Sequence, residues 1–207
     1  MIGVPSTGRH PVSPQRHTGR ELAQIATFAG IIAVLGLIPA VAPFGNAVPI
    51  TAQSLGVMLA GAILGGRRGG LAVLLFLALV ALGLPLLAGG RGGLGVFAGP
   101  SVGYLIGYPI AAFAVGVMTN AMGTPYRVAA GIGINILGGV LLLNLLGVLG
   151  MMVRLDLGVG AALVAAAPFM PGDVIKAVIC AFVAKGVHAA YPGLIRSRRA
   201  ERADALV

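Results

Sequence analysis

The sequence predicts an all-α integral membrane protein with six transmembrane helices, and both composition and charge spacing support this fold class. Of its 207 residues, 58% are hydrophobic and 9% are charged, whereas about 25% are charged in soluble domains. The mean hydropathy is +1.01. Uncharged stretches such as residues 22–66 and 92–126 exceed the ~20 apolar residues that a helix needs to cross a bilayer.

The first half of the chain predicts three spans. The first, residues 22–44, ends in the sequence PFGNAVP at 43–49, because prolines and a Gly-Asn pair favour a turn. The second, residues 50–64, is separated from the third, residues 71–84, by the sequence GGRRGG at 65–70. We expect that sequence to form a tight basic loop.

A glycine-rich stretch, residues 86–100, follows the third span. It is too apolar for a solvated linker and too rich in glycine for a stable helix. Irregular backbone at membrane depth is tolerated where it lines a cavity, so we expect an irregular glycine-rich outer loop there. Spans four and five follow at residues 101–122 and 128–152, joined by a short loop.

The end of the chain predicts one short helix and one full span. Residues 157–172 include only 16 uncharged residues, with Pro168 and Pro171 among them, which is short for a crossing. We interpret them as a re-entrant or surface helix. The sixth span covers residues 172–195 and leads into a basic tail.

Six crossings place both termini on one side of the membrane. That side has 11 of the 14 Lys and Arg residues, and the other three are Arg91, Arg154 and Lys176. The positive-inside rule therefore predicts cytoplasmic termini. The predicted organisation is a basic cytoplasmic tail (1–20), a six-helix membrane domain (21–195) and a second basic cytoplasmic tail (196–207).

Several classes of function are disfavoured. The net charge of +9 is spread over short loops and tails instead of one patch with aromatic residues, so we expect no nucleic acid partner. The one cysteine, Cys180, excludes an internal disulfide and a cysteine metal cluster. The chain has no Walker motif and no recognisable protease or zinc motif. We therefore expect no ATP hydrolysis, no catalysis and no cofactor.

Asp173 and Lys176 are the strongest candidates for a site. Residues three apart on a helix share a face, and ionisable residues within membrane segments usually serve a function. The alternative is that Asp173 caps the last helix while Lys176 extends to the outer interface. We favour a site, because the same face continues through small residues, Ala177, Cys180 and Ala184.

Other outer-face residues are also candidates. Arg91, between two glycine pairs, can approach a ligand carboxylate or anchor an outer loop in water. Gln53, with Thr51 and Ser54, can cap the second span or bind a polar ligand. Tyr104 shares a face of the fourth span with Tyr108, as a stacking wall for a ring or as part of an interfacial aromatic belt.

Two further patterns lie within the spans. Asn135 and Asn144 on the fifth span need partners in an apolar environment, and we interpret them as contacts between helices. The first span carries small residues at small-xxx-small spacing, including Ala29 and Ala33. Such a stripe lets another helix approach closely, either within this chain or from a partner membrane protein.

Four motifs in order resemble the BioY family, the biotin-binding membrane components of energy-coupling-factor (ECF) transporters. They are VPITAQ (48–53), AGGRGGLG (88–95), GPSVGY (99–104) and PGDVIK (171–176). The resemblance implies six membrane helices, a biotin site under outer loops, and partnership with a transmembrane coupling protein and two cytoplasmic ATPases. It also implies a place in the cytoplasmic membrane of a prokaryote.

The resemblance also implies roles for particular residues. Asp173 and Lys176 would bind the biotin head group or carboxylate, and a ureido ring offers N–H donors to Asp173 and a carbonyl to Lys176. Arg91 would then be a candidate for the carboxylate. Gly90 and Gly92 would cover the bicyclic ring. The remaining residues carried over are Gln53 and Tyr104 as biotin contacts and Ala29 and Ala33 as the surface that meets the coupling protein.

Two departures from the family pattern and three alternatives accompany this reading. Arg91 stands where a small or polar residue is expected, and Ser101-Val102 replaces the more usual Thr-Gly. One alternative is a biotin transporter that works alone or as an oligomer, without ATPases. A second is a structural membrane protein stabilised by an Asp173–Lys176 ion pair, and a third is a membrane enzyme.

Overall fold

The computed structural model describes residues 15–40, 48–192 and 194. The described residues form helices joined by turns and loops, and an isolated bridge pairs Leu87 with Arg91. The α-helices are α1 (Gln15–Leu35), α2 (Gln53–Leu64), α3 (Gly66–Ala81), α4 (Val102–Met122), α5 (Val128–Ile134), α6 (Leu142–Leu155), α7 (Val159–Ala166) and α8 (Phe169–Ala190). A 3₁₀ helix, η2 (Leu94–Ala98), precedes α4, and a π-helix, η3 (Asn135–Leu141), joins α5 to α6.

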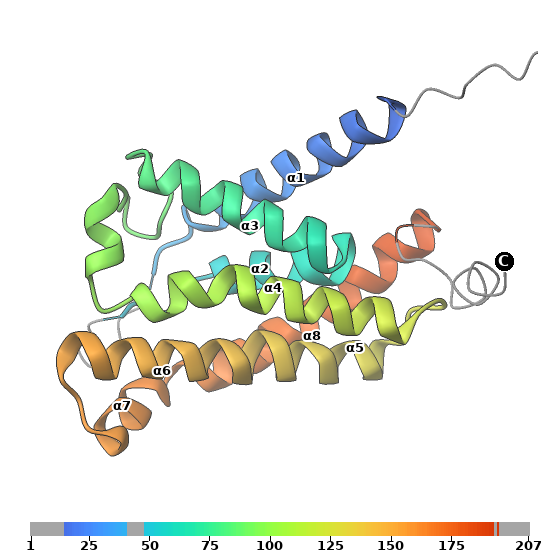
Figure 1. The fold of residues 1–207 in the computed structure, drawn as a ribbon. Coiled ribbons are helices and arrows are strands. Elements are labelled where there is room, and N and C mark those ends of the chain that lie inside the picture. Colours follow the sequence, from blue (N-terminus) through green and yellow to red (C-terminus); the bar gives the residue numbers. More distant parts are fainter. Residues whose placement is uncertain (1–14, 41–47, 193, 195–207) are drawn as a thin grey trace, which may run out of the picture.

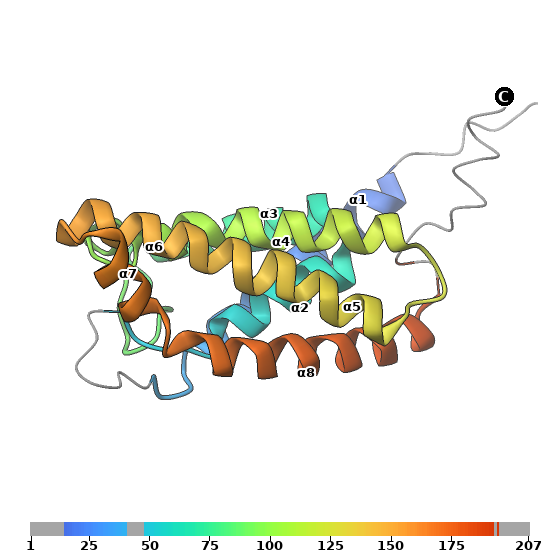
Figure 2. The same ribbon diagram turned by 90° about the horizontal axis from the view of Figure 1, so that it is seen from below.

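The long helices lie roughly side by side as one bundle. Helix α4 lies between α3 and the continuous rod formed by α5, η3 and α6 (Figure 1). Figure 2 shows α8 on the opposite face, with α2 between α8 and the α3–α4 layer. The short helix α2 contacts α1, α3, α4 and α8. The start of α1 and the end of α8 lie at the same end of the bundle (Figure 1).

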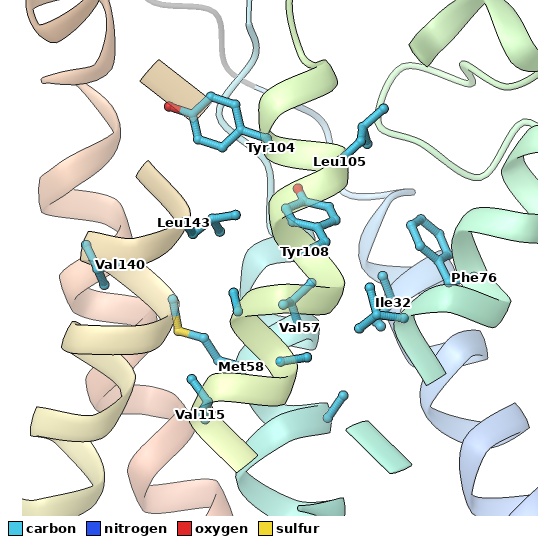
Figure 3. Packing of buried hydrophobic residues seen from close by; sticks show 14 of the residues in the cluster. Ile32, Val57, Met58, Phe76, Tyr104, Leu105, Tyr108, Val115, Val140 and Leu143 are labelled. Atoms are coloured by element: carbon cyan, nitrogen blue, oxygen red, sulfur yellow. The ribbon is translucent and has the colours of Figure 1, made fainter. Parts of the chain in front are cut away.

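The apolar interior and the apolar exterior are both extensive. The interior includes the fully buried Ile32, Met58 and Phe76, which Figure 3 shows packed between helices. Large hydrophobic residues such as Phe113 on α4 and Leu145 on α6 are exposed. An apolar surface of this extent is typical of a protein that contacts lipid.

Among the described residues, fewer helices than the six predicted are long and apolar enough to cross a membrane. Among the described residues, Val102–Met122 and Val128–Leu155 are long and apolar enough. A third span results if α7 and α8, which are bent by 50°, are counted as one. Helix α2 is apolar but shorter.

The first predicted span and the predicted basic loop differ from the structure. Helix α1 begins at Gln15, inside the predicted tail, and ends at Leu35. The predicted end of this span, residue 44, lies outside the described residues. Gly36, directly after the helix, lies so close to the backbone of Leu86 that a Cβ there would overlap. The prediction of a basic loop at residues 65–70 is wrong, because α3 already begins at Gly66.

Glycines in this segment permit close helix packing instead of a loop. Only Gly65, with φ of 81°, connects α2 to α3. A Cβ at Gly69 would lie 2.7 Å from the carbonyl oxygen of Ala60. Single-sequence patterns do not distinguish a glycine in a turn from one at a helix contact, which explains the error.

The last helix also begins earlier than predicted. Helix α8 starts at Phe169 instead of residue 172, so Pro171 lies in its first turn. Proline is tolerated there because the first N–H groups of a helix have no helical partner. The predicted glycine-rich loop is partly ordered, with a tight turn at Leu87–Arg91 and the η2 helix.

Candidate functional site

A pocket lined by both polar and apolar side chains lies at the end of the bundle where α2, α4 and α8 begin. The cavity within this pocket has a volume of about 40 Å³ that water-sized molecules can enter. Figure 3 shows Tyr104 and Tyr108 one above the other on α4, with Leu143 of the neighbouring helix nearby. The lining residues are Val48, Pro49, Thr51, Gln53, Ser54, Leu87, Arg91, Ser101, Tyr104, Leu105, Tyr108, Leu143, Phe169, Asp173 and Lys176.

Asp173 and Lys176 form a buried ion pair in this pocket. Lys176 Nζ lies 2.9 Å from Asp173 Oδ1, and the side chains are 15% and 6% exposed respectively. Asp173 does not cap α8, since its carboxylate bonds to side chains of other helices. The capping alternative is therefore wrong for this residue.

Lys176 is held within the protein and does not extend to the interface. Its ammonium donates to the carbonyl oxygen of Thr51 at 2.7 Å, to Ser54 Oγ at 3.0 Å and to Asp173 Oδ1 at 2.9 Å. An ammonium has three N–H donors, so all are used. Ser54 Oγ in turn donates to Asp173 Oδ1 at 3.2 Å.

The other carboxylate oxygen is bound from the opposite side of the bundle. Asn144 Nδ2 donates to Asp173 Oδ2 at 3.1 Å and to the carbonyl oxygen of Val140 at 3.0 Å. Tyr104 donates its hydroxyl to Asn144 Oδ1 at 3.1 Å and stacks on Phe169, with ring centroids 5.5 Å apart. The network therefore joins α2, α4, α6 and α8.

Gln53 lines the pocket, but its amide is already occupied. Its Nε2 donates to the carbonyl oxygens of Ile32, at 3.3 Å, and Leu86, at 3.0 Å. Its Oε1 accepts from the backbone N–H of Ala88 at 3.3 Å. With both donors used, Gln53 is suited to holding the segment at 86–88 against α1 and α2.

The glycine-rich turn brings Arg91 to the pocket, while its glycines shape the backbone. Arg91 is exposed and its Nε donates to the carbonyl oxygen of Ala88 at 3.2 Å. Gly90, with φ of 70°, and Gly92, whose Cβ would overlap the backbone of Leu84, are not among the lining residues. Their role over a bound ring stays a prediction.

The small residues Ala29 and Ala33 of α1 both pack within the chain, to different extents. Ala29 is 3% exposed and Ala33 is partly buried against the core. Packing within the chain therefore accounts for Ala29, as one of the two sequence interpretations proposed. Docking of a partner on Ala33 stays a prediction.

Sequence reasoning placed Asp173, Lys176, Arg91, Gln53 and Tyr104 near one another, and all five line the pocket. It did not identify Asn144 as part of the site, although the need of a buried amide for a partner was the available signal. It also did not identify Ser101. Among the described residues, no group of three His, Cys, Asp or Glu residues is placed to bind a metal.

Together, these features are those of a membrane protein with a small pocket: an apolar exterior surrounds a pocket of mixed polar and apolar lining at one end of a helical bundle. Comparison with known protein families identifies the family to which such a chain belongs. The BioY family model matches residues 11–193. The chain belongs to the BioY family.

Relatives and a solved structure support this membership. The biotin transporter BioY of Rhodobacter capsulatus is 47% identical over 189 residues, covering 86% of this chain and 98% of the relative. That of Rhizobium etli is 44% identical over 179 residues, covering 84% and 95%. The crystal structure of the S-component for biotin from an ECF-type ABC transporter matches with a TM-score of 0.81 and 29% identity, covering 86% of this chain and 95% of that one.

Proposed function

We propose that this chain binds biotin in the pocket at the start of α8 and serves in biotin uptake. The observation that carries the proposal is the buried Asp173–Lys176 pair, held by Ser54 and Asn144, in a chain whose family relatives are biotin transporters. A site of paired charges suits a neutral polar ring, because a ureido group offers both N–H donors and a carbonyl acceptor.

The pocket offers different chemistry to the two ends of biotin. The ureido ring would bond to Asp173 and to Lys176, whose ammonium would exchange one of its three bonds within the protein for the ring carbonyl. The bicyclic ring would pack beside Tyr104. The carboxylate would pair with Arg91, because the Lys176 ammonium is already neutralised by Asp173. Among the described residues, the ion pairs found do not include Arg91.

Binding requires the pocket to enlarge. The space of about 40 Å³ found here is small for a two-ring ligand, since ligand pockets usually measure about 300–1,000 Å³. The segment at 86–91 carries Arg91 and is tied down by Gln53. We propose that this segment moves aside on binding and then closes over the ring, with Gly90 and Gly92 allowing the approach.

The wider arrangement follows from the family. We propose six membrane crossings, with α1, α2 and α3 included, both termini on the cytoplasmic side and the pocket on the outer side of a prokaryotic cytoplasmic membrane. We further propose that a transmembrane coupling protein and two cytoplasmic ATPases supply the energy, since the chain has no Walker motif of its own. The structural neighbour is a component of an ECF-type ABC transporter, which supports this partnership.

Titration of labelled biotin tests the binding proposal. Wild type should bind, and Asp173→Asn should bind at least about 10-fold more weakly, because a hydrogen bond to a charged group contributes about 1.5–3 kcal/mol. Asp156→Asn is the matched control, since Asp156 is exposed and in a left-handed conformation that Asn tolerates. Folded wild type that does not bind biotin, or equal binding by the Asp173 variant, contradicts the proposed site.

Purification from native membranes tests the partnership. Tagged protein in mild detergent should co-purify with one membrane protein and two ATPases, and transport should require ATP. Biotin uptake by vesicles containing this chain alone, without ATP, would instead support the solitary transporter.

A further inference from the structure

One polar group in the pocket has no bonding partner. Among the described residues, only Ser101 Oγ, Tyr126 OH and Asn135 Oδ1 are buried side-chain polar atoms without a hydrogen bond. Of these three residues, Ser101 alone lines the pocket. Ser101 therefore offers the pocket a buried hydroxyl that is still available to a ligand.

The position of Ser101 makes the unpaired hydroxyl unexpected. It occupies the N-cap of α4, where a serine usually bonds to an N–H of the first turn, but it makes no capping hydrogen bond. The residue is 7% exposed. A buried hydroxyl without a partner is unfavourable, and a ligand acceptor in the adjoining pocket would offset that cost.

The surroundings favour an anionic acceptor. The α4 helix has 21 residues, and its N-terminus carries partial positive charge and N–H groups without helical partners. Arg91 lines the same pocket. Asp173, the acid of the pocket, is already bonded to Lys176, Ser54 and Asn144.

We propose that Ser101 donates its hydroxyl to the carboxylate of the bound ligand, beside Arg91 and at the N-terminus of α4. This inference rests on the proposed function and divides the pocket in two: the Asp173–Lys176 pair recognises the neutral ring, and Ser101 recognises the acid tail. Ser101 is thus a specificity residue, selecting the free acid over neutral derivatives.

The test compares biotin with biotinol, in which a neutral alcohol replaces the carboxylate. Ser101→Ala should weaken biotin binding by about 10- to 100-fold, the effect of losing a hydrogen bond to a charged group. It should weaken biotinol binding far less. Its thermal midpoint should equal or exceed that of wild type, because no hydrogen bond within the protein is lost.

Thr119→Val is the matched control. Thr119 is fully buried, and its hydroxyl donates to the carbonyl oxygen of Val115 at 2.8 Å, so this variant should leave the affinity unchanged. Unchanged biotin affinity in Ser101→Ala overturns the inference. Equal losses for biotin and biotinol overturn the carboxylate assignment. Wild type that binds neither ligand overturns the proposed function, and the inference with it.

Discussion

The Asp173–Lys176 pair is a neutral unit whose members depend on each other. Each would be a buried unpaired charge without the other, and removing one partner of such a pair typically costs about 3–5 kcal/mol. Ser54 and Asn144 satisfy the remaining bonding capacity of the carboxylate. Stability and binding therefore rest on the same side chains, and single variants mix the two effects.

A double variant separates stability from binding. We expect Lys176→Met to lower the free energy of unfolding by about 3 kcal/mol, because Asp173 loses its counter-charge. The double variant Asp173→Asn with Lys176→Met should recover much of the lost free energy of unfolding. It should nevertheless bind biotin no better than Lys176→Met alone. Thermal unfolding in detergent and biotin titration are the measurements.

An unaltered midpoint in Lys176→Met would contradict the buried pair. Arg154→Met provides the control, because Arg154 is exposed in the last turn of α6 and should change neither stability nor binding.

Gln53 illustrates a residue whose role differs from its sequence interpretation. Since its amide ties the backbone at residues 86 and 88, we expect Gln53→Leu to speed hydrogen exchange at Ala88 and to raise the biotin dissociation rate several-fold. Gln24→Leu, on the far part of α1, should do neither. Ala88 exchange identical to wild type would show that the segment is held by other contacts.

At the scale of elements, the helix periodicity predicted the local geometry but not the contacts between helices. The three-residue spacing of Asp173 and Lys176 predicted a shared face, and they form an ion pair. Asn144 and Ser54 complete the site from α6 and α2. The positions of Asn144 and Ser54 at the site depend on how α6 and α2 pack against α8. The local sequence of one helix does not determine that packing.

Glycines allow helices to approach closely elsewhere in the bundle, and one substitution tests this packing. A Cβ at Gly116 of α4 would overlap the backbone of Gly65 and Gly66, so we expect Gly116→Ala to lower the thermal midpoint by several degrees, corresponding to about 1–3 kcal/mol of overpacking. Gly133→Ala is the control. Gly133 has open space in α5, and alanine there should be neutral or stabilising by up to about 1 kcal/mol. A drop of equal size in both variants would contradict the packing argument.

At the scale of the whole molecule, the proposed topology is open to cysteine labelling. The native Cys180 is fully buried, so background labelling by a charged maleimide should be low. Gly158→Cys lies at the pocket end and should be labelled in intact cells. Thr124→Cys lies at the opposite end, is also exposed, and should require permeabilised cells. The reverse pattern would invert the proposed orientation.

The exposed Arg91 has an electrical consequence. Asp173 and Lys176 cancel, so the empty pocket carries the single positive charge of Arg91. A bound carboxylate would bring that total to zero. Moving one elementary charge across the full membrane potential changes the energy by about 2.3 kcal/mol per 100 mV, so the voltage would act on the empty pocket in proportion to its depth in the membrane, and not on the neutral loaded pocket. The proposed carboxylate contact would thereby cancel the share of that force that acts on the pocket, with the substrate itself as the counter-ion of Arg91.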